Sequence, residues 1–142
     1  MFSWDMVRYA VSKTALTAFT KELQRRFHSQ GLPIICIAVH PGEALTEGLL
    51  EVNNVVVRTL ARMAFTTAEQ GAITPLFAAT AKDIRENPAK YDGKFIMPIG
   101  KPAAPHPIVE NEQQVKALWD VTTTELNKQL SAENLPPLRS WE

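Results

Sequence analysis

The stretch PIICIAVHPG, Pro33 to Gly42, decides the fold class of this 142-residue chain. Its centre, residues 34–39, is six apolar residues in a row, most of them β-branched. A short apolar run without alternation predicts a strand that is covered on both faces, as in the interior of a parallel sheet. The sequence His40-Pro41-Gly42 predicts the end of that strand, because proline cannot donate a ladder hydrogen bond and glycine permits unusual dihedrals.

Upstream of this strand the sequence predicts a long helix from Val7 to Phe27. Its apolar residues recur at helical spacing, at Val7, Val11, Ala15, Phe19, Leu23 and Phe27, with Ala10, Leu16 and Ala18 widening the stripe. Basic residues near its C-terminal end suit the helix dipole. Gly31 and Pro33 predict where it stops.

Downstream of the strand the pattern is mixed at first and then periodic again. Residues 43–65 give no clear signal, although residues 49–64 could form a helix. Thr66 and Glu69 have capping-box spacing before the apolar run GAITPLFAATA, in which Pro75 would require a kink. Asp92-Gly93 predicts a turn into a second strand, residues 94–99.

The last third of the chain is predicted to be irregular and then helical. Residues 98–107 contain four prolines and a glycine, and we expect them to run over a surface as irregular chain. Residues 110–130 have the spacing of an amphipathic helix, followed by an extended tail. Its expected inward residues are Val115, Leu118, Val121, Leu126 and Leu130.

Helices alternate with only two strands, and both strands suit a parallel sheet. Parallel sheets need several strands and helices on both faces, so two strands alone would leave sheet edges and helix surface exposed. We therefore predict an α/β fold that is the C-terminal half of a doubly wound, Rossmann-like parallel sheet, with about two strands and flanking helices. Residues 1–108 would form this part, and residues 109–142 the C-terminal helix and extended tail of the same domain.

The composition excludes several classes of partner. Fifteen basic and fifteen acidic side chains cancel, so we expect no nucleic-acid partner and no anionic membrane surface. No window approaches the roughly 18 apolar residues of a membrane span, and the first residues lack a signal-peptide core. We expect a cytoplasmic protein.

The cysteine and the histidines suggest no further chemistry. The single cysteine, Cys36, cannot form an intrachain disulfide, and its apolar neighbours predict a small buried side chain. His28, His40 and His106 lie far apart with no other ligand at metal-binding spacing, so we predict no metal site. His40 is expected to be a turn residue, and the three tryptophans, Trp4, Trp119 and Trp141, to be buried against neighbours.

Within the first helix, the stretch YAVSK places Tyr9 and Lys13 one turn apart on the same face. An ammonium near a phenol favours the phenolate, which suits a proton donor and acceptor for carbonyl and alcohol chemistry. Taken alone, this pair is weak evidence, because a tyrosine and a lysine at this spacing also arise by chance and can simply pack together.

The order of the motifs carries more information. Tyr9-Ala-Val-Ser12-Lys13 resembles the Tyr-x-x-x-Lys signature of the short-chain dehydrogenase/reductase family. The buried strand and Pro41-Gly42-Glu43-Ala44-Leu45-Thr46 follow, as the Pro-Gly turn and its threonine do in that family. Tyr91-Asp92-Gly93-Lys94-Phe95 resembles the turn into that family's last sheet strand. The resemblance covers roughly residues 4–100 and implies that residues 1–108 are the C-terminal part of an NAD(P)-binding domain.

The resemblance implies roles for six residues. Tyr9 would be the general acid and base that exchanges a proton with the substrate oxygen while a hydride moves to or from nicotinamide. Lys13 would favour the ionised form of Tyr9 and bind the nicotinamide ribose. Pro41 and Gly42 would shape the turn beside the nicotinamide. The backbone at Ala44, where the family often has valine, and the hydroxyl of Thr46 would bind its carboxamide. The cofactor would be NAD or NADP.

Two family features have no counterpart in this sequence. The family pairs its tyrosine with a serine about a dozen residues earlier, whereas eight residues precede Tyr9 here. Its Gly-rich phosphate loop is also absent, because no glycines in the chain have Gly-x-x-x-Gly-x-Gly spacing. We therefore expect a fragment of an NAD(P)-dependent oxidoreductase with little activity alone, acting on a small carbonyl or alcohol substrate. The apolar residues between Glu47 and Phe65, the expected lid, hint at an apolar substrate.

Two alternatives remain open from the sequence. The chain could be a non-catalytic interaction module that forms homo- or hetero-oligomers through the helix Val7–Phe27, because exposed apolar surface usually marks an interface. It could also be a truncated gene product that continues upstream in a longer protein.

Overall fold

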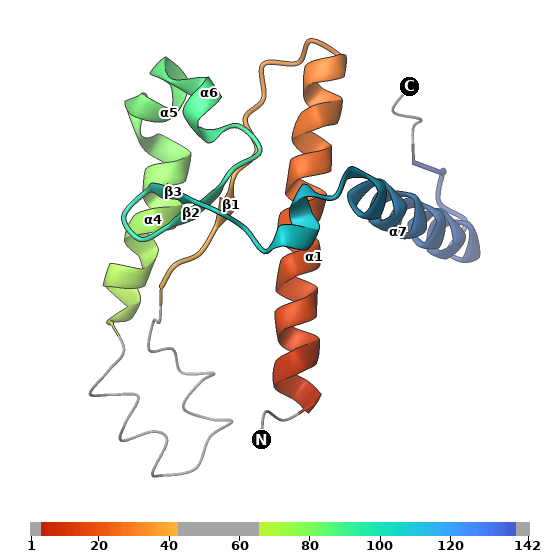
Figure 1. Ribbon diagram of the computed structural model, residues 1–142. Helices are drawn as coiled ribbons and strands as arrows, with labels where there is room; N and C mark the ends of the chain where they lie inside the picture. Colours follow the sequence, from red (N-terminus) through yellow and green to blue (C-terminus); the bar gives the residue numbers. More distant parts are fainter. Residues whose placement is uncertain (1–3, 43–65, 139–142) are drawn as a thin grey trace.

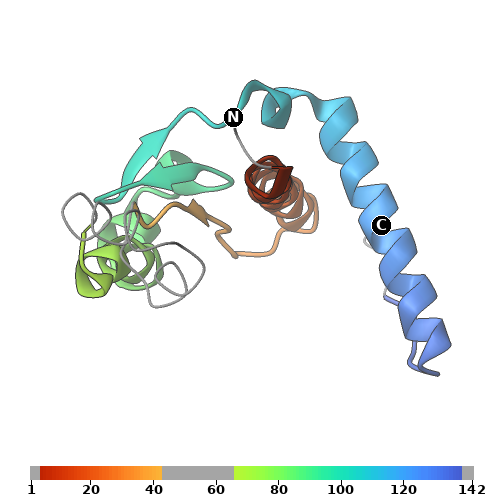
Figure 2. The ribbon, with the colours of Figure 1, turned by 90° about the horizontal axis from the view of Figure 1, so that it is seen from below.

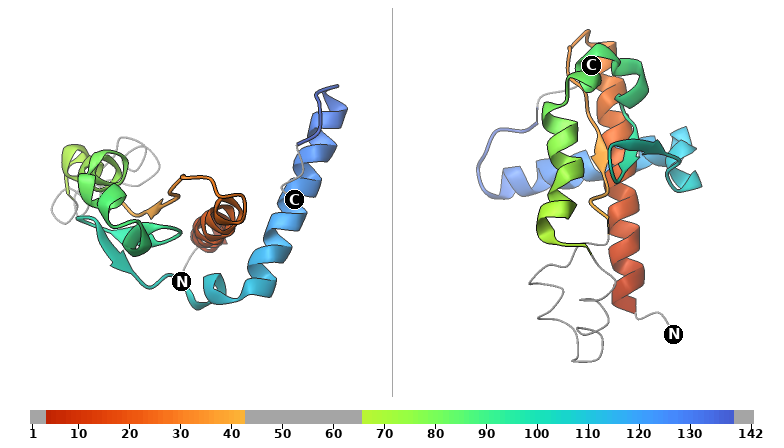
Figure 3. Two further views of the ribbon diagram at one scale, coloured as in Figure 1. Left: turned by 90° about the horizontal axis from the view of Figure 1, so that it is seen from above. Right: turned by 90° about the vertical axis from the view of Figure 1, so that its left-hand side faces the viewer.

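A computed structural model describes residues 4–42 and 66–138 of the chain, with helices on both sides of a small sheet (Figure 1). The long helix α1 (Trp4–Ser29) contacts the first strand from one side, and α4 (Ala68–Thr80) contacts the same strand from the other. Views from below and above show the strands between these two helices (Figures 2 and 3). The α/β fold class is confirmed.

The sheet has three strands in the order β1-β2-β3. β1 (Ala38–Val39) is parallel to β2 (Phe95–Met97), with Ala38 opposite Phe95. β3 (Lys101–Ala103) is antiparallel to β2, with Met97 opposite Lys101. The parallel pair was predicted from the two apolar runs, and the third strand was not.

Both predicted strands are shorter than the apolar runs that predicted them. Residues 34–37 precede the regular strand, but the N–H of Gly93 still donates to the carbonyl of Cys36 at 2.8 Å. The second run, predicted over residues 94–99, ends after Met97 because the chain turns back at residues 98–100. Gly100 has a φ of +65° there, a conformation that glycine adopts without a steric cost.

Gln24 of α1 extends the hydrogen bonding of β1 beyond the start of β2. Its side-chain N–H donates to the carbonyl of Ile34 at 3.0 Å, and its side-chain oxygen accepts the N–H of Cys36 at 2.6 Å. The Gln24 side chain is buried, so it satisfies two main-chain groups that water cannot reach easily. A side-chain amide here does what a neighbouring strand would do, and it fixes α1 against β1.

The opposite edge of β1 is open. The main-chain groups of Ile35, Ile37 and Val39 alternate with those that bond to β2, and they make no hydrogen bond in residues 4–42 or 66–138. Their side chains pack with a buried cluster under α4 instead. Within the described residues, β1 therefore has one unpaired edge between two covered faces.

Two buried clusters hold the layers together. The first, Ala18, Val109 and Val115, joins α1 to the short helix η1 (Pro107–Glu110) and to α7 (Glu112–Ala132). The second joins the sheet to α4 and to the short helices α5 (Lys82–Glu86) and α6 (Pro88–Tyr91). Its buried members are Ile84, Tyr91 and Ile96.

The helix α7 packs on the side of α1 away from the sheet (Figure 2). Trp119 stacks on Phe19 with ring centroids 4.8 Å apart, and the guanidinium of Arg26 lies 4.3 Å from the Trp119 ring. Trp119 was expected to be buried and is, whereas Trp4, with the same expectation, is 80% exposed. Val121 and Leu126, both predicted to point inward, are exposed as well, and the buried residues of α7, Val115 and Trp119, lie in its N-terminal half.

The predicted capping box is shifted by one residue. Thr67 accepts the N–H of Gln70, and the Gln70 side chain accepts the N–H of Thr67, so this pair replaces Thr66 and Glu69. Both pairs have the same spacing, and the sequence alone does not distinguish them. The helix α4 then continues through Pro75.

Candidate functional site

Tyr9 and Lys13 lie together on the exposed N-terminal half of α1. The Nζ atom of Lys13 is 5.3 Å from the centroid of the Tyr9 ring, so the ammonium and the phenol share one face of the helix. The Tyr9 residue is 61% exposed, and the hydroxyl of Ser12 donates to its main-chain carbonyl at 2.7 Å. The expected pairing of phenol and ammonium is present in the structure.

The turn after β1 has the shape that its Pro-Gly sequence predicted. Gly42 has a φ of +89°, and a Cβ atom there would lie 3.1 Å from Cγ of Pro98. The Gly42 N–H donates to Nδ1 of His40 at 2.9 Å. His40 is therefore the turn residue that we expected, since its side chain closes the turn.

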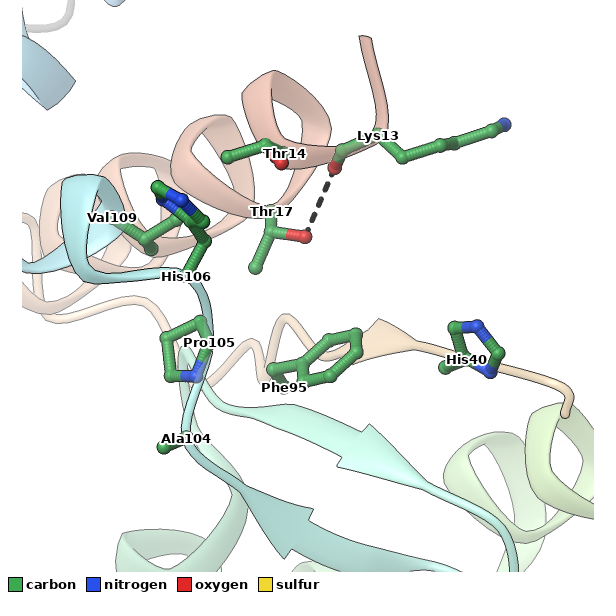
Figure 4. A pocket seen from close by; sticks show the side chains of 9 residues that line it. All are labelled: Lys13, Thr14, Thr17, His40, Phe95, Ala104, Pro105, His106 and Val109. Atoms are coloured by element: carbon green, nitrogen blue, oxygen red, sulfur yellow. Dashed lines mark hydrogen bonds between the residues drawn. The ribbon is translucent and has the colours of Figure 1, made fainter. Parts of the chain in front are cut away.

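A cavity of about 170 Å³ connects the helix motif with this turn (Figure 4). Its walls come from α1, from the end of β1, from β2 and from the chain that follows β3. The lining residues are Lys13, Thr14, Thr17, His40, Phe95, Ala104, Pro105, His106 and Val109. Lys13 and His40, 27 positions apart in the sequence, thus line a common space.

The structure brings together only some of the predicted site residues. Lys13 lines the cavity, and His40 places the start of the Pro41-Gly42 turn at its wall. Tyr9 stands beside Lys13 and is not among the lining residues. Ala44 and Thr46, and the expected lid from Glu47 to Phe65, lie outside the described residues.

Several lining residues were missed by the sequence analysis. Thr17 follows Lys13 by four positions, so helical spacing could have found it, whereas the spacing of Thr14, one position after Lys13, gives no such signal. The wall segment from Ala104 to Val109 falls mostly within residues 98–107, which were predicted to run over a surface as irregular chain. It forms a wall because Val109 is buried between α1 and α7, a long-range contact with no local signal.

The charged groups of the described residues do not form a metal site. Within residues 4–42 and 66–138, no cluster of three or more histidine, cysteine or acidic side chains could hold an ion. Cys36 is half-buried, and burial raises the pKa of its thiol. In the same ranges, no helix is both long enough and apolar enough to cross a membrane.

The residues fit one end of a dinucleotide better than the other. Lys13 and His40, the residue before the Pro41-Gly42 turn, line one cavity, as the wall of a nicotinamide subsite would require. Within the described ranges, the positive-φ glycines at 31, 93 and 100 lead into irregular chain or strands rather than into a helix, so they form no pyrophosphate cradle.

Comparison with known proteins identifies the family. The chain is 36% identical over 115 residues to the short-chain dehydrogenase/reductase dpchH of Colletotrichum higginsianum, a match that covers 81% of this chain and 29% of that protein. It is 37% identical over 115 residues to dpmpH of Macrophomina phaseolina, covering 81% of this chain and 57% of that protein. It is 32% identical over 119 residues to mouse retinol dehydrogenase 12, covering 80% of this chain and 34% of that protein.

The chain belongs to the short-chain dehydrogenase/reductase family. It spans between about a third and somewhat over half the length of the first fungal relatives that it matches. No family model matches the chain. No solved structure matches it significantly.

Proposed function

We propose that this chain is the proton-transferring part of an NAD(P)-dependent oxidoreductase that interconverts a carbonyl and an alcohol. The observation that carries the proposal is the position of Lys13, which lies over the Tyr9 ring and also lines the cavity shared with the turn after β1. Membership of the short-chain dehydrogenase/reductase family supports the reaction class. A longer polypeptide would supply the pyrophosphate cradle and the remaining walls.

In this proposal the chain's own residues handle the proton. In the direction of alcohol oxidation, the Tyr9 phenolate takes the hydroxyl proton as the C–O bond gains double-bond character. Lys13 stabilises that phenolate and binds the ribose next to the nicotinamide. A bound nicotinamide would accept the hydride from the carbon while Tyr9 takes the proton from the oxygen, so the alcohol loses one hydride and one proton. Pro41 and Gly42 shape the wall beside it, with Ala44 and Thr46 as the proposed carboxamide contacts.

The substrate class is proposed more coarsely. A small carbonyl or alcohol follows from the family, and an apolar one is suggested by Phe95, Pro105 and Val109 in the cavity wall. The choice between NAD and NADP depends on residues near the adenosine ribose, which this part of a dinucleotide site does not contact.

A hybrid protein tests the proposal. This chain would replace the corresponding part of dpchH, of which the matched residues are only 29%, so that the host supplies the remaining chain. We expect oxidation of NADPH or NADH with a panel of apolar aldehydes and ketones, and a loss of at least about 100-fold on Tyr9→Phe. Tyr91→Phe is the matched control, because Tyr91 is the only other tyrosine and is buried away from the cavity.

Two results would overturn the proposal. If the hybrid binds NADPH, as followed by nucleotide fluorescence, but shows no turnover with any member of the panel, the chain does not supply the proton-transferring residues. Turnover that survives Tyr9→Phe would contradict the role of Tyr9. The 142-residue chain alone is expected to show no turnover, since much of an enzyme's rate comes from holding both reactants together.

An interaction module is the second candidate function. The observation that favours it is the exposure of large apolar side chains along the first half of α1, including Trp4, Val11 and Leu16. The open edge of β1 adds unpaired main-chain groups. Both features are sites where another polypeptide could add buried area.

A further inference from the structure

We infer that His40 is a positioning residue, which holds the Pro41-Gly42 turn in one conformation beside the cavity that His40 and Lys13 line. The inference rests on the proposed function, in which this turn forms the wall beside the nicotinamide. The observations that carry it are the contacts of the His40 main chain, of its imidazole and of Gly42.

The His40 main chain is fixed by the sheet. Its N–H donates to the carbonyl of Ile96 at 2.9 Å, which extends the parallel pairing of β1 with β2 by one residue. Ile96 itself is fully buried. The backbone at the start of the turn therefore has little freedom.

The imidazole of His40 is also held in place, and it restricts the conformation of the turn. Its ring packs edge-on against Phe95, with centroids 6.3 Å apart and planes at 81°, which restricts the side-chain rotamer. Its Nδ1 atom accepts the Gly42 N–H at 2.9 Å. A neutral imidazole that accepts at Nδ1 carries its proton at Nε2, so the contact also selects one tautomer.

Gly42 needs such a constraint because glycine has many conformations available. Its φ of +89° lies in a region that other residues rarely adopt, and glycine also populates the opposite sign of φ freely. The His40 contact selects one of these conformations. Pro98, whose Cγ would lie 3.1 Å from a Cβ at Gly42, closes the turn from the other side.

The position of His40 makes this constraint relevant to the cavity. His40 and Lys13 line the same space from β1 and α1, so a shift of the turn changes the distance between the two walls (Figure 4). Because the hydrogen bond shapes the turn before and during the reaction alike, its loss should weaken dinucleotide binding and leave the chemical step nearly unchanged.

The kinetic test uses the hybrid protein and two substitutions of His40. His40→Ala removes the acceptor, and we expect the KM for the dinucleotide to rise about five- to tenfold, as for one lost neutral hydrogen bond, with kcat changed less than about twofold. His40→Asn restores an acceptor that can bond to an N–H two residues on, and should bring KM back to within about threefold. His28→Ala is the control, because His28 is exposed and pairs with Asp92 away from the cavity.

Two kinetic outcomes would overturn the inference. A fall in kcat with KM unchanged would mean that His40 takes part in the chemical step. Equal effects of His40→Ala and His40→Asn, or no effect of either, would mean that the hydrogen bond to Gly42 does not position the turn.

A measurement on the 142-residue chain keeps the test independent of activity. Nitrogen-15 NMR of the imidazoles should show the Nε2-protonated tautomer of His40, and hydrogen exchange of the Gly42 amide should be faster in His40→Ala by about the same five- to tenfold. His106→Ala, at the same cavity, should leave that amide unchanged. If the hybrid fails to turn over, the proposed function fails, whereas slow exchange at Gly42 that depends on residue 40 would still support the positioning of the turn.

Discussion

At the scale of single residues, Gly100 shows how one missing side chain permits a contact between two elements. A Cβ atom at Gly100 would overlap the ring of Phe77, which packs in the cluster under α4. The hairpin between β2 and β3 can approach α4 only because this atom is absent. The local sequence predicts neither the type of this turn nor the contact between Gly100 and Phe77, since Ile99-Gly100 would suit many turns.

Gly100→Ala should therefore lower the free energy of unfolding by more than the cost of placing alanine at a positive φ. Gly31 is the matched control, because its φ of +64° equals that of Gly100 within a degree and nothing lies within 4 Å of its Cβ position. We expect Gly31→Ala to lower the free energy of unfolding by about 1 kcal/mol, and Gly100→Ala by about 2 to 5 kcal/mol. Urea unfolding followed by circular dichroism measures both, and equal losses would show that Phe77 moves aside freely.

Asp83 gives a prediction for pH. The hydroxyl of Tyr91 donates to its carboxylate, as do the ammonium of Lys90 and the amide of Asn87, and these contacts lower the pKa of Asp83 to about 2. Because the folded pKa lies below the ordinary value of 3.8, the contribution to stability is complete above about pH 4 and is lost as the pH falls toward 2.

The melting temperature measured between pH 2 and pH 6 tests this assignment. Asp83→Asn should melt lower than the unchanged chain at pH 6, and the difference should shrink as the pH falls through that window. Asp120→Asn is the control, because the exposed Asp120 pairs only with Lys116 on its own helix and should change little. A difference between the Asp83 proteins that stays constant down to pH 2 would contradict the assignment.

At the scale of elements, the predictions that succeeded depended on local pattern. Helical spacing predicted a helix over Val7–Phe27, and α1 contains that range. The apolar run before Pro41-Gly42 predicted a covered parallel strand, and β1 pairs in parallel with β2. The same local spacing placed Tyr9 and Lys13 on one face, which accounts for the part of the site that could be predicted.

The elements that were missed depend on distant contacts. β3 was not predicted because Pro102 lies inside it and its three residues have no apolar alternation, so only pairing with β2 makes it a strand. Val121 was predicted to point inward and is exposed, whereas Trp119, whose burial was predicted, packs against Phe19 and Arg26 of α1. The cavity wall from Ala104 to Val109 has the same origin.

Gln24 is the residue through which α1 and β1 are joined, and its loss should weaken the pairing of two elements. Gln24→Met keeps the length of the side chain but leaves the carbonyl of Ile34 and the N–H of Cys36 without their partner. We expect a loss of about 2 to 4 kcal/mol in the free energy of unfolding. Gln30→Met, at an exposed position just after α1, should cost less than about 0.5 kcal/mol. Equal losses would show that water replaces the Gln24 amide.

At the scale of the whole molecule, both faces of the sheet are covered by helices. Among the described residues, one edge of β1 is unpaired and the N-terminal half of α1 is exposed. Residues 4–13 of α1 are all exposed, while the second half of the helix is partly covered by α7 and the sheet, with Ala18, Glu22 and Gln24 buried. A family member of greater length has more chain with which to cover such surface, and the relatives matched here are longer. Without that chain, the same surface is available to a second polypeptide.

We therefore expect the 142-residue chain to self-associate, and the association to depend on α1. Val11→Lys places a charge among the exposed apolar residues of this helix and should weaken association by at least about tenfold, because each buried apolar side chain contributes roughly 1.5 to 3 kcal/mol. Val121→Lys on α7 is the matched control, since Val121 is 68% exposed and Val11 is 63% exposed. Sedimentation velocity over a range of concentrations measures the effect. A monomer at all concentrations would remove the interaction module as a candidate function, and equal weakening by the two substitutions would place the interface elsewhere than on α1.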